Sequence, residues 1–187
     1  MSIEQLCEHR NAQILVVDIQ GKLFPHIAQR EHLLLRAGQL LEAAALFNIP
    51  VTIVEQYPQG LGKTHPDILK AANNAVTFNK TTFSALATPA ISEHLKRLQQ
   101  PDLIILGTES HVCVLQTAID ALDRGFNVLL AWDACGSRFE EDKSLAFHRL
   151  KDAGCKMLST EMFLFEWMRD KNHPNFSHII ESLRDTK

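Results

Sequence analysis

Short apolar segments alternate with amphipathic segments along most of the chain, and this alternation restricts the possible folds more than any other feature. Six of the apolar segments are rich in branched side chains and have the length of strands. They are ILVVDI (14–19), IPVTIVEQ (49–56), AVTFNK (75–80), DLIILG (102–107), NVLLAWDA (127–134) and CKMLS (155–159). Because uninterrupted apolar strands are typical of parallel sheets that are covered on both faces, the sequence predicts an α/β fold. We expect a three-layer α/β/α sandwich with about six mostly parallel strands and helices on both faces.

The segments between these strands have the spacing of helices. Residues 30–47 repeat apolar side chains at the 3.6-residue period of an amphipathic helix. Gly125 and Gly154 stand where helices commonly end, and Pro89 suits a first helical turn. The predicted helices are 30–47, 66–74, 88–99, 112–124, 140–153, 160–169 and 176–184, and QYPQGLGKT (56–64) is predicted to be a loop.

Composition narrows the class of protein. The 187 residues have the size of one domain, so we expect a single domain over residues 1–187. Nineteen basic against 22 acidic residues give a net charge of −3, which disfavours nucleic acid as a partner. The chain has no apolar stretch of the ~20 residues that a membrane span needs. The four cysteines are irregularly spaced, which favours reduced thiols and a cytoplasmic location.

Three reactive side chains stand near the carboxyl ends of predicted strands. Asp18 lies near the end of the first strand, Lys80 ends the third, and Cys113 follows the fourth after a short turn. Since ligands of open parallel sheets bind beyond these ends, we expect all three groups at one edge. A helix N-terminus and a nearby lysine lower the pKa of a thiol, and a carboxylate can accept its proton. Spacing alone also fits a core cysteine and a solvated lysine.

The residues around these positions resemble a known family. VVDIQ (16–20), FNKTTFSAL (78–86) and the block at 107–138 resemble the isochorismatase-like cysteine hydrolase superfamily, which includes nicotinamidases and N-carbamoylsarcosine amidohydrolases. The loop EQYPQGLGKT (55–64) and the tail at 160–180 are similar to the isochorismatase-domain-containing branch of eukaryotes and its bacterial relatives. The likeness covers nearly the whole chain and implies the isochorismatase-like hydrolase fold.

The resemblance implies a function and its residues. It implies that Asp18, Lys80 and Cys113 form a triad that cleaves a small amide or related C–N bond through a thioester on the cysteine. It also implies a cis peptide bond between Thr108 and Glu109, and an oxyanion hole made by the backbone amides of Glu109 and Cys113. A small-molecule substrate and a homo-oligomer are further implications. The alternatives are a catalytically silent binding or scaffold protein of the same fold and a peroxide sensor based on Cys113.

The chain also departs from relatives with other activities. Nicotinamidases carry metal-binding histidines after the second strand, where this chain reads EQYPQG, so we expect no metal and no cofactor. GLGKT (60–64) resembles part of a phosphate-binding loop, but Tyr57 replaces the first glycine of that pattern. The predicted substrate-binding residues lie in the surrounding loops and in the turn before the cysteine: Gln20, Leu23, Phe24, Tyr57, Phe83, His111 and Val112.

A few residues leave two interpretations open. Trp132 fits either an aromatic pocket or packing on the sheet, and His111 fits either the pocket or a subunit interface. Cys135 and Cys155 lie in or beside predicted strands, which favours positions in the core.

Overall fold

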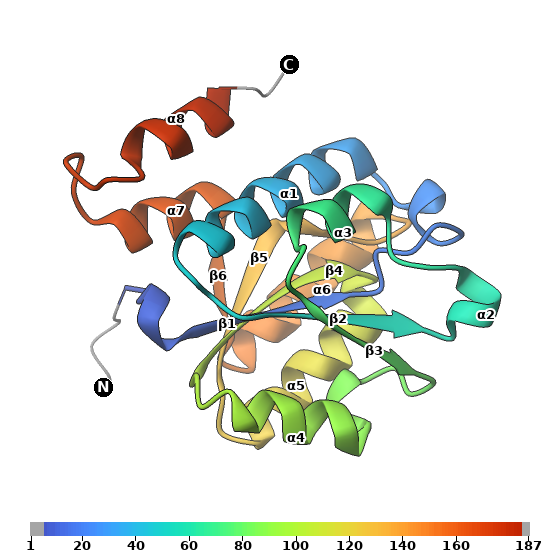
Figure 1. The fold of residues 1–187 in the computed structure, drawn as a ribbon. Helices are drawn as coiled ribbons and strands as arrows, with labels where there is room; N and C mark the ends of the chain where they lie inside the picture. The colour runs from blue at the N-terminus through green and yellow to red at the C-terminus, as the bar shows by residue number, and fades with distance from the viewer. Residues whose placement is uncertain (1–5, 185–187) are drawn as a thin grey trace.

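The computed structural model describes residues 6–184, and its centre is a six-stranded sheet with the strand order β3-β2-β1-β4-β5-β6 (Figure 1). All neighbouring strands are parallel, which confirms the predicted sheet. The ends of the predicted 1–187 domain, residues 1–5 and 185–187, lie outside the described residues. The strands are β1 (Ala12–Val17), β2 (Val51–Gln56), β3 (Val76–Lys80), β4 (Asp102–Thr108), β5 (Asn127–Gly136) and β6 (Lys156–Leu158).

Helices connect the strands and follow the predicted pattern with one exception. The α-helices are α1 (Arg30–Leu46), α2 (Pro58–Leu61), α3 (Pro66–Ala71), α4 (Pro89–Arg97), α5 (Leu115–Asp123), α6 (Glu140–Asp152), α7 (Thr160–Met168) and α8 (Phe176–Arg184). Helix α2 lies inside the segment predicted to be a loop, so that prediction is wrong in part. Pro58 presets the backbone of its first turn, and the N–H groups of Leu61 and Gly62 donate to the carbonyls of Tyr57 and Pro58.

The helices form the two outer layers of the sandwich (Figure 1). Helices α1, α3 and α7 cover one face, and α8 packs against α1 and α7 on the outside. Helices α4, α5 and α6 cover the other face. Elsewhere in the chain, short 3₁₀ turns lie at His9–Asn11, Phe24–His26 and Ala85–Ala87. None of the helices in residues 6–184 is both long and apolar enough to cross a membrane.

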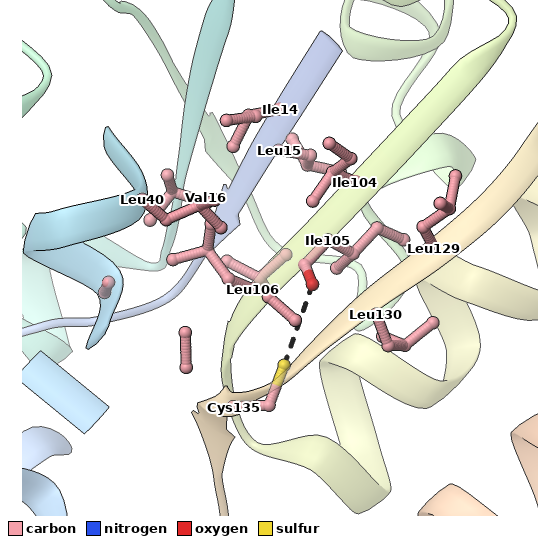
Figure 2. Close-up of a cluster of buried hydrophobic side chains, with 14 of the residues drawn as sticks. Ile14, Leu15, Val16, Leu40, Ile104, Ile105, Leu106, Leu129, Leu130 and Cys135 are labelled. Atoms are coloured by element: carbon pink, nitrogen blue, oxygen red, sulfur yellow. Dashed lines mark hydrogen bonds between the residues drawn. The ribbon is translucent and has the colours of Figure 1, made fainter. Parts of the chain in front are cut away.

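The core lies along the two middle strands (Figure 2). Every residue of β1 is buried, and β4 is buried from Leu103 to its end. Burying one such aliphatic side chain contributes about 1.5–3 kcal/mol. Cys135 and Cys155 are both buried, and the Cys135 thiol donates to the carbonyl of Ile105 at 3.7 Å. The predicted core positions of these two cysteines are therefore confirmed.

A glycine lets the two middle strands approach closely at their carboxyl ends. Gly107 adopts a φ of +126°, and a Cβ atom there would overlap the carbonyl oxygen of Val17. Any other residue would push β4 away from β1 at this point. The pairing of β4 with β5 also shifts register beside this glycine. The close approach brings the segments that follow β1 and β4 together, and both carry predicted site residues.

Candidate active site

Three side chains from the carboxyl ends of β1, β3 and β4 meet beneath the surface. The Lys80 ammonium nitrogen lies 2.7 Å from Oδ2 of Asp18, and neither side chain is exposed to solvent. The Cys113 thiol lies close enough to both groups for their charges to act on its pKa, and the residue is 7% exposed. The structure therefore brings together the three residues that the strand-end argument selected, although they are separated by 62 and 33 positions in the chain.

Asp18 is held by its backbone on both sides. It follows β1 with a φ of 52°, a left-handed conformation that aspartate tolerates better than most residues. Its N–H donates to the carbonyl of Val54 at 3.1 Å, and its own carbonyl accepts from the Thr108 hydroxyl at 2.6 Å. Strands β2 and β4 thus both fix the point from which the carboxylate projects. Oδ1 of Asp18 is buried and has no hydrogen-bond partner of good geometry among the described residues.

Lys80 is the last residue of β3, and its ammonium group is surrounded by acceptors. Besides Asp18, it donates to Oε1 of Gln56 at 2.7 Å and to the carbonyls of Thr82 and Phe83 at 3.3 Å each. Four oxygen acceptors surround its three N–H bonds in a buried site, and they hold the ammonium group in one position. The lysine is a fixed positive charge.

Burial decides the protonation state of the thiol. Burial, with a smaller contribution from the Asp18 carboxylate, raises the pKa of Cys113 to about 12, and Lys80 opposes the rise. The lowered thiol pKa expected from the sequence is therefore wrong. Cys113 lies in a π-helical turn, Ser110–Val114, before the first turn of α5, and it is buried beside a carboxylate. The thiol accordingly keeps its proton until a base removes it.

Asp18 is the base that lies closest to this proton. Burial raises the pKa of its carboxyl group, and the Lys80 ammonium opposes that rise. A carboxylate with a raised pKa accepts a proton more readily than an ordinary one. The free Oδ1 atom leaves room for the proton on the side that Lys80 does not occupy. The arrangement can therefore pair the departure of the thiol proton with attack by sulfur.

The turn before the cysteine has a backbone that differs from an ordinary helix start. The peptide bond between Thr108 and Glu109 is cis. The Glu109 carbonyl then accepts from the N–H groups of Val112 and Val114 at 3.1 Å each. These bonds close the turn on both sides of Cys113 and fix the position of its thiol.

Two glutamines connect the site, and the sequence argument found only one of them. The side chain of Gln20 accepts from the Gln56 N–H at 2.8 Å and donates to the Gln56 carbonyl at 3.0 Å. The Gln56 side chain donates to the Thr81 carbonyl at 2.9 Å and accepts from Lys80. Gln20 thus holds the end of β2, while Gln56 contacts Lys80. The signal that would have found Gln56 is its place as the last polar residue of β2, the criterion that selected Lys80 on β3.

Sequence comparison matches residues 12–162 to a family described as the isochorismatase domain. The chain belongs to the isochorismatase family. Isochorismatase domain-containing protein 2 of Bos taurus is 34% identical over 94% of this chain and 84% of its own length. A solved structure described as the MAR1 ribonuclease of Caenorhabditis elegans is 32% identical, with a TM-score of 0.90 over 97% of this chain and 94% of its own. The family resemblance read from the motifs is confirmed.

A solved structure with lower sequence identity has the same fold. The YcaC gene product of Escherichia coli, described as an octameric hydrolase of unknown specificity, is 22% identical. It has a TM-score of 0.88 over 100% of both chains. Together with the sheet order, this likeness confirms the predicted three-layer α/β/α fold of the isochorismatase-like hydrolases.

The aromatic residues considered for substrate binding lie in three different environments in this isochorismatase-family chain. Tyr57 and Phe83 are 55% and 54% exposed, and both lie in segments that border Lys80. Phe24 is buried in the core, where its ring packs against His65 at 5.1 Å between centroids, because the 3₁₀ turn directs it inward. Trp132 lies away from the triad, in a groove that is also lined by Phe147 and Met157.

The other predicted substrate-binding residues lie around the turn that carries the cysteine. Nδ1 of His111 is 2.9 Å from the Ser137 hydroxyl, and Nε2 is 3.8 Å from Asp142. His111 therefore ties the turn to the end of β5 and to α6. Val112 is half-buried and packs against the core, and Leu23 is half-buried in the loop that follows Asp18.

A buried carboxylate that the sequence argument missed fixes the loop beside the site. Glu55 is 2% exposed and accepts from the N–H and the hydroxyl of Thr64 at 2.8 and 2.9 Å, and from Lys63 at 3.2 Å. The lysine and threonine of GLGKT are thus engaged with protein. Across residues 6–184, the His, Cys, Asp and Glu side chains form no group of three or more that could hold a metal ion.

Proposed function

We propose that this chain is a cysteine hydrolase that cleaves a small amide or a related C–N bond. The observation that carries the proposal is that the Cys113 thiol lies beside a buried ion pair. In this pair, the Lys80 ammonium nitrogen is 2.7 Å from Oδ2 of Asp18. A structural cysteine gains nothing from such a pair, because burying two charges is costly. The same three groups supply a nucleophile, a proton acceptor and a fixed positive charge.

The first half of the proposed reaction forms a thioester. Asp18 accepts the thiol proton as the Cys113 sulfur attacks the carbonyl carbon of the substrate. The backbone N–H groups of Glu109 and Cys113 hold the developing oxyanion, and the Lys80 charge stabilises the ionised groups. The C–N bond then breaks, and Asp18 returns the proton to the departing nitrogen, which leaves as an amine.

The second half restores the enzyme. Water attacks the thioester carbonyl while Asp18 accepts one of its protons. The C–S bond breaks, the sulfur takes that proton back, and a carboxylic acid leaves. The net reaction consumes one amide and one water and yields one acid and one amine.

The relative described as a ribonuclease suggests a second substrate class, which the geometry of this site supports less well. Cleavage of RNA needs cationic groups that are free to hold a phosphate. Lys80, the cation beside Cys113, has four oxygen partners and no exposed surface, so it has no free donor for a phosphate, and the net charge of −3 disfavours binding along a polyanion. We therefore propose an amide substrate and use RNA as a comparison in the test.

The test is turnover of a panel of small amides by the wild type and by Cys113→Ala, with single-stranded RNA as a further substrate. We expect the wild type to hydrolyse at least one amide, Cys113→Ala to lose that activity, and an acid-quenched sample to carry an acyl group on Cys113. Equal rates in the two proteins would contradict the mechanism. RNA cleavage that survives in Cys113→Ala would favour the other substrate class, and no turnover by the wild type would favour a binding or scaffold role.

We further propose that the chain forms a homo-oligomer and resides in a reducing compartment such as the cytoplasm. The octameric state described for the Escherichia coli YcaC gene product supports the first point. Exposed apolar side chains on β5 and α7, Trp132 and Met162 at 48% each, also support it. All four cysteines are free thiols, which supports the second point. Light scattering during size-exclusion chromatography measures the subunit number.

A further inference from the structure

A cavity with cationic walls borders the turn that carries the cysteine. It has a volume of about 660 Å³ and is lined by residues that follow β1, β4 and β5, together with Leu61 of α2. Three of its side chains are basic: Lys22, His26 and Arg138. Segments from three strand ends therefore converge on one opening at the edge of the sheet where ligands of such folds bind.

Arg138 is oriented by a carboxylate. Its Nε donates to Oε1 of Glu109 at 2.9 Å, and its backbone N–H donates to the same oxygen at 3.3 Å. The Glu109 side chain is 11% exposed and the Arg138 side chain 51%. The two terminal nitrogens of the guanidinium have no hydrogen-bond partner within residues 6–184. This leaves the planar two-nitrogen edge free, the edge that binds a carboxylate with two parallel bonds.

The other residues of the cavity complete a site for an organic anion. In the described part of the chain, the side chain of Lys22 has neither a hydrogen-bond partner nor an ion-pair partner. Lys22 and Arg138 outnumber the one carboxylate, Glu109, and His26 adds an imidazole. The remaining walls are apolar, with Leu23, Leu61 and the 61% exposed Phe139. Apolar walls with a few convergent polar groups are typical of a small-molecule site.

The cavity is connected to the triad through two backbone segments. Glu109 begins the turn whose hydrogen bonds enclose Cys113. Leu23 lies in the loop after Asp18, where its N–H donates to the carbonyl of Gln20 at 3.1 Å. A molecule held in the cavity therefore lies against the segments that position the nucleophile and the base.

We propose that this cavity is an anion subsite, and that the substrate of the hydrolase is a small amide with a carboxylate that binds Arg138 and Lys22. The second half of this statement rests on the function proposed above. The apolar walls hold the body of the molecule, and Glu109 keeps the guanidinium aimed at its carboxylate. Selection comes from charge, because a neutral analogue of the same shape leaves the cations unpaired.

The first test measures binding without turnover. Calorimetry compares benzoate with benzamide, which has nearly the same shape and no charge, on the wild type and on Arg138→Gln. We expect benzoate to bind the wild type about tenfold more tightly than benzamide, and Arg138→Gln to remove that difference. Arg169→Gln is the matched control, because Arg169 is also half-exposed and pairs with a glutamate, Glu8, outside the cavity. Equal binding of the two ligands, or equal losses in the two variants, would overturn the subsite.

The second test connects the subsite to the thiol. Iodoacetate and iodoacetamide alkylate the same sulfur, but only iodoacetate is charged. The rate of Cys113 alkylation by iodoacetate divided by the rate with iodoacetamide therefore reports whether cationic groups beside the thiol attract an anion. We expect this ratio to fall about tenfold in Arg138→Gln and to stay unchanged in Arg169→Gln, and benzoate to protect Cys113 in the wild type. Benzoate bound at Arg138 without protection of the thiol would overturn the assigned substrate class. If the subsite passes both tests but Cys113→Ala keeps full amide turnover, the proposed hydrolase mechanism fails and the anion subsite remains.

Discussion

Gln56 and Lys80 are paired across strands β2 and β3, and the amide oxygen of Gln56 lies 2.7 Å from the ammonium nitrogen. The same glutamine is bonded through its backbone to Gln20 and through its side-chain N–H to the Thr81 carbonyl. Hydrogen bonds of both its backbone and its side-chain N–H therefore fix the position of the amide oxygen. This pairing makes Gln56 a positioning residue for the lysine, in addition to the three residues of the proposed triad.

Replacing Gln56 with alanine tests this role. The ammonium group loses one of its two shortest contacts, so its position beside Asp18 becomes less defined. We expect kcat to fall about 10- to 100-fold, as small displacements in a catalytic geometry commonly cost, while KM changes little. The pH profile of Cys113 alkylation should move as well, because Lys80 acts on the thiol pKa. Gln59→Ala, which replaces an exposed glutamine of α2 three residues further along the chain, is the control. A Gln56→Ala enzyme with an unchanged kcat and pH profile would exclude the role.

The sequence predicted where the residues of the proposed triad lie, but it gave the wrong direction for the pKa shift of the thiol. Asp18, Lys80 and Cys113 follow from the rule that ligands bind at the carboxyl ends of parallel strands, and Gln56 satisfies the same rule on β2. The raised pKa of Cys113 did not follow, since it depends on burial and on the nearby Asp18, which are properties of the folded arrangement. The inward position of Phe24 likewise depends on a short 3₁₀ turn that has no periodic pattern.

Removing the Asp18 charge should make the thiol more reactive while it abolishes turnover. Asp18 raises the pKa of Cys113 and Lys80 lowers it, so in Asp18→Asn the lysine acts unopposed and the thiol pKa falls. The thiolate fraction at a given pH rises about tenfold for each unit by which the pKa falls. We expect faster alkylation of Cys113 by iodoacetamide at pH 8 in Asp18→Asn than in the wild type, with loss of amide hydrolysis because the base is gone.

Two controls make the Asp18→Asn result specific. Peptide mass analysis must locate the alkylated residue, because Cys7, Cys135 and Cys155 are also free thiols. Lys80→Met removes the opposing charge and should slow alkylation of Cys113 relative to the wild type. Slower alkylation in Asp18→Asn would mean that the carboxylate activates the resting thiol, contrary to the pKa argument.

The buried cysteines should make the protein less stable in alkaline solution. Burial raises the pKa of Cys135 from 9.0 to about 12. Below pH 9 the thiol is protonated in both the folded and the unfolded chain, so its contribution to the free energy of unfolding does not change with pH. Between pH 9 and 12 only the unfolded chain ionises, so the free energy of unfolding falls by about 1.4 kcal/mol per pH unit for this thiol.

Urea unfolding of the wild type and Cys135→Ala over this pH range isolates the effect. The variant loses packing and the bond to the Ile105 carbonyl, which lowers its stability by a constant amount. We expect its stability to fall less steeply than that of the wild type between pH 9 and 12, by about 1.4 kcal/mol per unit. Parallel curves would show that the thiol titrates alike in both states.

The loop beside the site depends on one buried carboxylate. Glu55 accepts three hydrogen bonds from Lys63 and Thr64, and it holds the segment that contains α2 and Leu61 against the end of β2. In Glu55→Ala the buried N–H and hydroxyl of Thr64 lose their acceptor, which costs about 1–3 kcal/mol of unfolding free energy. We expect limited proteolysis to cut residues 57–63 faster, and benzoate to bind more weakly because Leu61 lines the anion subsite. Glu55→Gln keeps an acceptor oxygen for Thr64 and should retain most of the protection. Equal proteolysis of the two variants would show that charge, rather than hydrogen bonding to Thr64, fixes the loop.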